Sequence, residues 1–79
     1  MERSEISAKV KKVVAQVLGV KADGLKDEDR FVDDLGAESI QSLELVAAFE
    51  DEFDIDMEEE AALAIKTVGG AVDFIGKCL

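Results

Sequence analysis

Ser39 is the residue whose type and position best suit a chemical role. It follows a glycine-containing turn, Asp34-Leu35-Gly36-Ala37-Glu38, and stands at the start of a predicted helix. A phosphate on its hydroxyl would face free backbone N–H groups and the positive end of the helix dipole. Because Asp33, Asp34 and Glu38 crowd the same place with negative charge, an enzyme that adds phosphate there must supply cations. The alternative is that Ser39 only caps the helix, which is a common role for serine.

The other residue types argue against a self-contained enzyme. The chain has no His, so Ser–His–Asp and Cys–His nucleophiles and His-ligated metal sites are impossible. The acids from residue 54 to residue 60 lack the glycine and the spacing of an EF-hand, so we predict no specific metal site. The one cysteine, Cys78, cannot form an internal disulfide, which suits a reducing compartment and predicts a cytoplasmic protein.

Length and charge predict one small acidic domain. Residues 1–79 have the length of a single domain, and 48% hydrophobic residues are too many for a disordered tail. The formal net charge of -10 argues against nucleic-acid and anionic-membrane partners. Fifteen acids and one base lie between residues 27 and 60, so a basic partner would be steered there. No oligomerisation surface stands out, and we expect a monomer.

Apolar spacing predicts four helices and no strands. The first begins after an N-cap at Ser4 and ends at Gly19, and residues 19–37 form a long ordered loop with room for a short helical turn. A second helix spans residues 39–53, a short third helix spans 58–63, and Thr67 caps the last. The predicted fold class is therefore all-α, a four-helix bundle with a long first loop and a short third helix.

Each helix is expected to turn one apolar stripe toward the core. In the last helix the pair Gly69-Gly70 interrupts this pattern at a cost of roughly 1 kcal/mol per glycine, so we expect that helix to start loosely or to be the least stable element. The residues expected to face inward are Ile6, Val10, Val13, Val14, Val17 and Leu18, then the loop anchors Val20, Leu25, Phe31, Val32 and Leu35, then Leu43, Val46, Ala47, Phe49 and Phe53 with Leu45 on the flank, and finally Val68, Ala71, Val72 and Ile75.

The residues around Ser39 resemble those of an acyl carrier protein. The hallmark of that family is an Asp-Ser-Leu tripeptide that opens the second helix, preceded by a Leu-Gly turn and followed by a Glu-Leu pair. Here the segments that match are Asp34-Leu35-Gly36-Ala37-Glu38-Ser39-Ile40, Leu43-Glu44-Leu45-Val46, Glu50-Asp51-Glu52-Phe53-Asp54, Val10-Lys11-Lys12-Val13-Val14, Leu18-Gly19-Val20 and Ile65-Lys66-Thr67-Val68. Glu38 replaces the usual Asp, Ile40 the usual Leu, and Glu58 a common Pro. Together with Gly69-Gly70, these departures leave open whether the chain serves general fatty acid synthesis or a specialised pathway.

The resemblance implies a carrier rather than an enzyme. Ser39 would receive 4'-phosphopantetheine from coenzyme A through a phosphopantetheinyl transferase, and the thiol of that arm would hold acyl chains as thioesters. Enzymes that transfer or extend the acyl chain would dock basic patches on the second helix. The matching positions are Glu38, Ile40, Glu44, Glu50 and Asp51. The alternative for these residues is an ordinary solvated helix surface.

In this family the acyl chain can also fold back into the apolar centre of the bundle. Candidates to border such a cavity are Leu43, Val46, Phe49, Ile65 and Ala71, and the alternative is that they are ordinary core. Two other functions stay open. One is an aminoacyl or peptidyl carrier, which the strongly acidic second helix disfavours. The other is an unmodified acidic interaction module in which Ser39 is only a cap.

Overall fold

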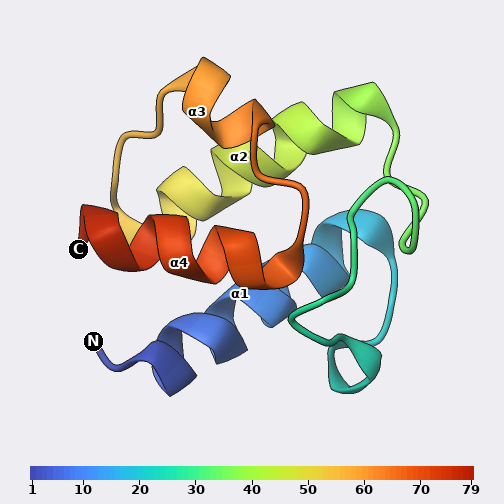
Figure 1. Ribbon diagram of the computed structural model, residues 1–79, viewed down its shortest axis with the longest axis horizontal. Helices are drawn as coiled ribbons and strands as arrows, with labels where there is room; N and C mark the ends of the chain where they lie inside the picture. Colours follow the sequence, from blue (N-terminus) through green and yellow to red (C-terminus); the bar gives the residue numbers. More distant parts are fainter.

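Four α-helices and one short 3-10 helix make up this protein, seen in a computed structural model that describes residues 1–79. The elements are α1 (Arg3–Leu18), η1 (Ala22–Gly24), α2 (Ser39–Phe53), α3 (Glu59–Leu63) and α4 (Val68–Cys78). The α1 helix packs against both α2 and α4, while α3 lies beside α2 (Figure 1). The structure has no strands, which confirms the predicted all-α bundle with a long first loop and a short third helix. No helix is long and apolar enough to cross a membrane.

The α1 helix ends as predicted but begins earlier. Gly19 adopts a left-handed conformation with a φ of 70°, and its N–H donates to the carbonyl of Ala15 at 2.9 Å. The predicted N-cap at Ser4 is wrong, because the helix begins at Arg3 and Glu2 is its N-cap. No side chain caps this end. Instead, Arg3 forms an ion pair with Asp73 of α4, which holds the first turn against the bundle.

The α2 helix buries Phe49 and Phe53 as its apolar spacing predicts, but it is rotated so that Leu45, rather than Leu43, faces the core. Leu45, Phe49 and Phe53 are its buried residues. Leu43 is 47% exposed and Ala47 is also exposed, so their predicted inward position is wrong. Apolar residues lie on nearly every face of this helix, so spacing alone does not define its orientation. Packing against α1 decides it.

The loop between α1 and α2 is ordered by two buried anchors. Leu25 and Phe31 are buried, and the predicted helical turn exists as η1. Val32, however, is 60% exposed, so its expected role as an anchor is wrong. Its neighbour Phe31 already fills the core position, and the chain reverses direction immediately afterwards, which leaves Val32 on the outside.

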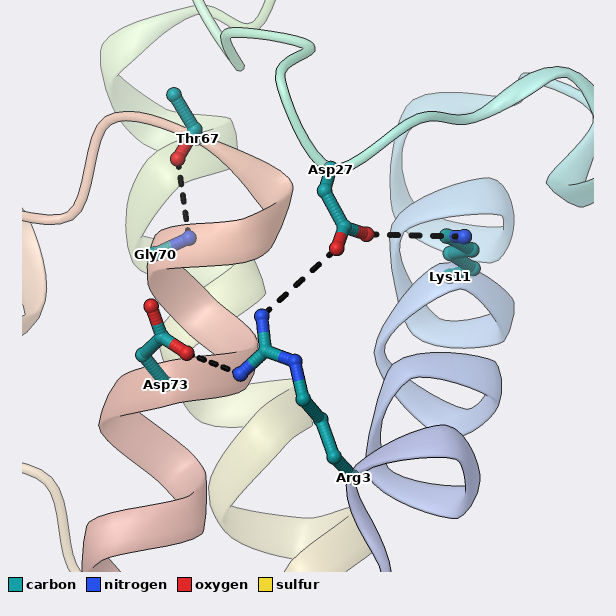
Figure 2. A network of polar contacts seen from close by, with 6 residues as sticks. All are labelled: Arg3, Lys11, Asp27, Thr67, Gly70 and Asp73. Carbon is teal, nitrogen blue, oxygen red and sulfur yellow. Dashed lines mark hydrogen bonds and ion pairs between the residues drawn. The ribbon is translucent and has the colours of Figure 1, made fainter.

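The two C-terminal helices match the prediction closely. The α3 helix starts at Glu59 with Glu58 as its N-cap, one residue later than predicted. Thr67 caps α4, since its hydroxyl oxygen accepts a hydrogen bond of 3.0 Å from the N–H of Gly70 (Figure 2). The four predicted core residues of α4 are all buried: Val68, Ala71, Val72 and Ile75.

Candidate functional site

A tight chain reversal leads into Ser39. Gly36 has a φ of 70°, a left-handed conformation that strains residues with a side chain, and its N–H donates to the carbonyl of Val32 at 3.1 Å. The next residue, Ala37, is buried, and its N–H donates to the carbonyl of Phe31 at 2.8 Å. These two bonds hold the backbone on the core two residues before Ser39, which then enters α2.

Ser39 is the first residue of α2 and does not cap it. The N-cap is Glu38, whose own N–H donates to Oε1 of Gln41 at 2.9 Å. The Ser39 side chain is exposed, and its hydroxyl forms no hydrogen bond within the protein. The backbone N–H groups of Ser39 and Ile40 also donate to nothing, as expected of a helix N-terminus. The hydroxyl is therefore free to react and lies at the positive end of the helix dipole.

Acidic residues directly precede Ser39 in the chain, and one base offsets part of their charge. Arg30 lies 3.4 Å from Asp33 and 3.4 Å from Asp34, measured between its guanidinium nitrogens and the carboxylate oxygens. The backbone N–H of Arg30 donates to the Asp34 carboxylate at 2.8 Å, and this bond is the main cause that lowers the pKa of Asp34. Glu38 has no cationic partner. The site therefore carries excess negative charge, as the sequence predicted.

A largely apolar pocket of about 460 Å³ opens one helical turn beyond Ser39. Ser42 lines it, and residues three apart lie on the same side of a helix, so Ser39 lies on the pocket side of α2, one turn before the first α2 residue of the lining. Of the predicted cavity residues, three line the pocket: Val46, Phe49 and Ile65.

The other two predicted cavity residues lie elsewhere. Leu43 faces solvent, and Ala71 is fully buried within the helix packing, so neither lines the pocket. Spacing arguments missed Phe31, Met57 and Ala62, which line it from the long loop, the α2–α3 connection and α3. Apolar residues in the irregular segments could have indicated these positions, because the pocket forms where those segments cover α2.

The residues predicted to meet partners fall into two groups. Ile40, Glu44 and Asp51 lie at positions 1, 5 and 12 counted from Ile40, on one outward face of α2, and all are exposed. Glu38 is exposed immediately before them. Glu50 differs, because it is half-buried and its carboxylate accepts a hydrogen bond of 3.1 Å from the N–H of Met57. Glu50 thus fastens the turn after α2.

The outward face of α2 keeps its negative charge unpaired. Neither Glu44 nor Asp51 forms an ion pair. Four bases pair instead with acids of the loop, of α4 and of the inner edge of α2, where Lys12 lies 3.9 Å from Glu52. The other three are Arg3, Lys11 and Arg30. Ile40, which is 64% exposed, adds an apolar side chain to the same face near Ser39. This combination of exposed acids and one exposed apolar residue suits a basic partner with an apolar contact.

Comparison with known proteins points to one family. A family model described as "Phosphopantetheine attachment site" matches residues 8–75. The chain is similar to the structure of an acyl carrier protein from Enterococcus faecalis, with a TM-score of 0.82, 39% sequence identity and complete coverage of both chains. It is also similar to a candidate acyl carrier protein from Mycobacterium tuberculosis, with a TM-score of 0.87 and 28% identity over 94% of this chain and 99% of that one.

Proposed function

Because this chain belongs to the acyl carrier protein family, whose covalent group is 4'-phosphopantetheine, we propose that Ser39 carries this group. The observation that supports the proposal is the free Ser39 hydroxyl at the N-terminus of α2, beside an apolar pocket. In the loading step, the Ser39 hydroxyl loses its proton and forms a bond to the phosphate of the arm. The pyrophosphate bond of coenzyme A breaks in the same step, and adenosine 3',5'-bisphosphate leaves.

The residues around Ser39 fit a phosphate diester. The free N–H groups of Ser39 and Ile40 offer donors to its oxygens, and the helix dipole favours its charge. The carboxylates of Asp33 and Glu38 oppose it, so the phosphopantetheinyl transferase must bring cations. When bound, the group supplies a thiol that holds acyl chains as thioesters.

The pocket favours acyl cargo over aminoacyl cargo. Nine of its thirteen lining residues are hydrophobic, and they include Val46, Phe49 and Ile65. A hydrocarbon chain gains about 0.8 kcal/mol for each buried CH₂ group, while a charged amino group would lose hydration there. We therefore place fatty acid, lipid or polyketide synthesis ahead of peptide synthesis as the role of this carrier.

Docking is assigned to the outward face of α2. Exposed acids such as Glu44 and Asp51 raise the rate of encounter with basic enzymes more than they raise affinity. Fast encounter and fast release suit a carrier that visits several enzymes in turn. Glu50 contributes less to this face, because its carboxylate is already bonded to the Met57 N–H.

Loading of matched serine variants tests the attachment site. Incubation with coenzyme A, Mg²⁺ and a broad-specificity phosphopantetheinyl transferase should add the mass of phosphopantetheine to the wild-type protein and to Ser42→Ala, but not to Ser39→Ala. Ser42 is the matched control because it lies on the same side of α2 one turn further on. Intact mass spectrometry gives the result, and circular dichroism confirms that each variant is folded. Unmodified wild-type protein would instead favour the acidic interaction module.

A further inference from the structure

Two segments far apart in the sequence pair with each other beside the pocket. The N–H of Gly69 donates to the carbonyl of Asp27 at 2.8 Å, and the N–H of Val68 donates to that of Asp29 at 3.0 Å. The N–H of Phe31 completes the set by donating to the carbonyl of Lys66 at 3.0 Å. These three bonds join residues 27–31 of the long loop to residues 66–69 at the entry to α4. Both segments contribute lining residues to the pocket.

Gly69 makes this close approach sterically possible. A Cβ atom at this position would lie 3.1 Å from both the Cβ and the carbonyl oxygen of Asp27, closer than most real contacts. A larger residue therefore requires Asp27 to give way by a few tenths of an ångström, and we expect this shift to weaken the 2.8 Å hydrogen bond. Glycine at position 69 lowers helix propensity, but it also allows the close packing of α4 against Asp27.

Asp27 is also held from its other side. Its carboxylate lies 3.7 Å from the guanidinium of Arg3 and 3.8 Å from the ammonium of Lys11, both on α1. Figure 2 shows Arg3 between Asp27 and Asp73, so that α1, the loop and α4 meet at this one guanidinium. Each ion pair is exposed and individually weak. Together they join the Asp27 side chain to α1, while its backbone carbonyl is bonded to Gly69.

Phe31 connects this pairing to Ser39. Its N–H donates to the carbonyl of Lys66, and its own carbonyl accepts a hydrogen bond of 2.8 Å from the N–H of Ala37. Its buried side chain lines the pocket. Ala37 lies two residues before Ser39. A shift of the loop away from α4 would therefore move the turn that delivers Ser39 to the start of α2.

We propose that Gly69 and Phe31 are positioning residues for Ser39, acting through the backbone pairing of residues 27–31 with residues 66–69. This inference rests on the proposed function, because Ser39 needs a defined position only if an enzyme must reach it. With the pairing closed, the turn before Ser39 is held on the core. With the pairing open, the turn loses its fixed point and Ser39 is presented in many orientations.

Amide hydrogen exchange on the unmodified protein tests the structural coupling. Gly69→Leu should accelerate exchange at Phe31, Val68 and Ala37 by about tenfold relative to Val14 in the core of α1. Gly69→Ala should accelerate exchange at the same amides by a smaller factor. It replaces the leucine variant in this test if that variant fails to fold. Gly76→Leu and Gly76→Ala are the matched controls, because a Cβ there meets only Ile6 at an ordinary 3.7 Å.

The exchange result separates three outcomes. Local acceleration that reaches Ala37 supports the proposal. Acceleration at Phe31 and Val68 that stops before Ala37 overturns it, because the pairing then opens without moving the turn. Equal acceleration at every amide, Val14 included, also overturns it, because the pairing is then no independent unit.

Loading kinetics test the consequence for Ser39. Gly69→Leu or Gly69→Ala should lower kcat/KM for phosphopantetheinyl transfer by up to about tenfold, because small misplacements of a reacting group are costly. Gly76→Leu and the core variant Val13→Ala should stay within about twofold, although Val13→Ala lowers global stability. An unchanged kcat/KM in both Gly69 variants overturns the proposal. If wild-type protein accepts no group at all, the proposed function fails, while the exchange result still decides the coupling.

Discussion

At the scale of single residues, the site depends on which side chains are engaged and which are free. Glu38 and Gln41 secure the N-terminus of α2, and this leaves the Ser39 hydroxyl without any partner. Asp34 does the opposite, since its carboxylate is bonded to the backbone of Arg30 and so closes the turn that precedes Ser39. The proposed attachment residue and the residue that supports its turn are thus separate, which lets each be changed without the other.

Replacement of Ser39 by alanine should leave the fold almost unchanged. Because the hydroxyl is exposed and unbonded, we expect the free energy of unfolding to change by at most about 0.5 kcal/mol. Urea denaturation of the unmodified proteins measures this. A loss near the ~1 kcal/mol typical of a removed N-cap would show that Ser39 does cap α2 in solution.

Asp34 should make stability depend on pH. Its pKa is lowered in the folded state, so its contribution is present above the ordinary aspartate value of about 3.9 and is lost as the pH falls through the lower folded value. The urea midpoint of wild-type protein should therefore exceed that of Asp34→Asn at pH 7, and the difference should shrink as the pH falls below the ordinary aspartate value and through the lower folded one. Asp23→Asn is the control, because Asp23 forms no hydrogen bond or ion pair. A difference that stays constant with pH would contradict this role.

At the scale of elements, the orientation of α2 divides the functions of the site. One face carries Leu45 and Phe49 into the core and pocket, while the opposite face presents Ile40, Glu44 and Asp51 to solvent. Ser39 stands at the end of the helix where both faces can be reached. Under the proposed function, a single helix would therefore offer one side to the cargo and the other to partner enzymes.

Two leucines test this orientation. Leu45 is 3% exposed and Leu43 is 47% exposed, although only two residues separate them. We expect Leu45→Ala to lower the free energy of unfolding by about 2–5 kcal/mol, through lost burial and a residual cavity. Leu43→Ala should cost less than about 1 kcal/mol. Equal losses, measured by urea denaturation, would mean that α2 is rotated from the orientation described.

At the scale of the whole molecule, charge separates α2 from the rest of the chain. The ion pairs of Arg3, Lys11 and Lys12 lie between α1 and its neighbours, so they neutralise the inside edges of the bundle. The outward face of α2 keeps its acids unpaired. With a net charge of -10, the molecule as a whole attracts cationic surfaces, and this face offers them exposed, unpaired acids.

Charge reversal tests whether this face guides docking. Glu44→Lys should slow loading and acyl transfer, most clearly at low ionic strength, where the Debye length is longest. Glu28→Lys changes the net charge equally at an exposed loop residue without an ion pair, and it should slow the reaction less. Rates measured across a salt series decide between them. Equal slowing by both variants would indicate that only net charge matters.

The sequence alone determined the features that depend on local periodicity and turn chemistry. The α4 stripe of Val68, Ala71, Val72 and Ile75, the end of α1 at Gly19 and the cap at Thr67 all follow from such rules. The place of Ser39 at the start of a helix, directly after a glycine turn, also follows from them. At these turns and helix ends, few other backbone conformations would provide hydrogen-bond partners for the free N–H and C=O groups.

Tertiary structure decided what depends on contacts between distant segments. The orientation of α2 required packing against α1, because its apolar residues allow several orientations. The engagement of Glu50 by Met57, and the contact of Gly69 with Asp27, join residues that no local rule connects. The pocket arises in the same way, since Phe31 and Ile65 meet only when the loop and the entry to α4 are brought together. Periodicity predicts which side of a helix is apolar, but a shared cavity exists only once the elements have packed.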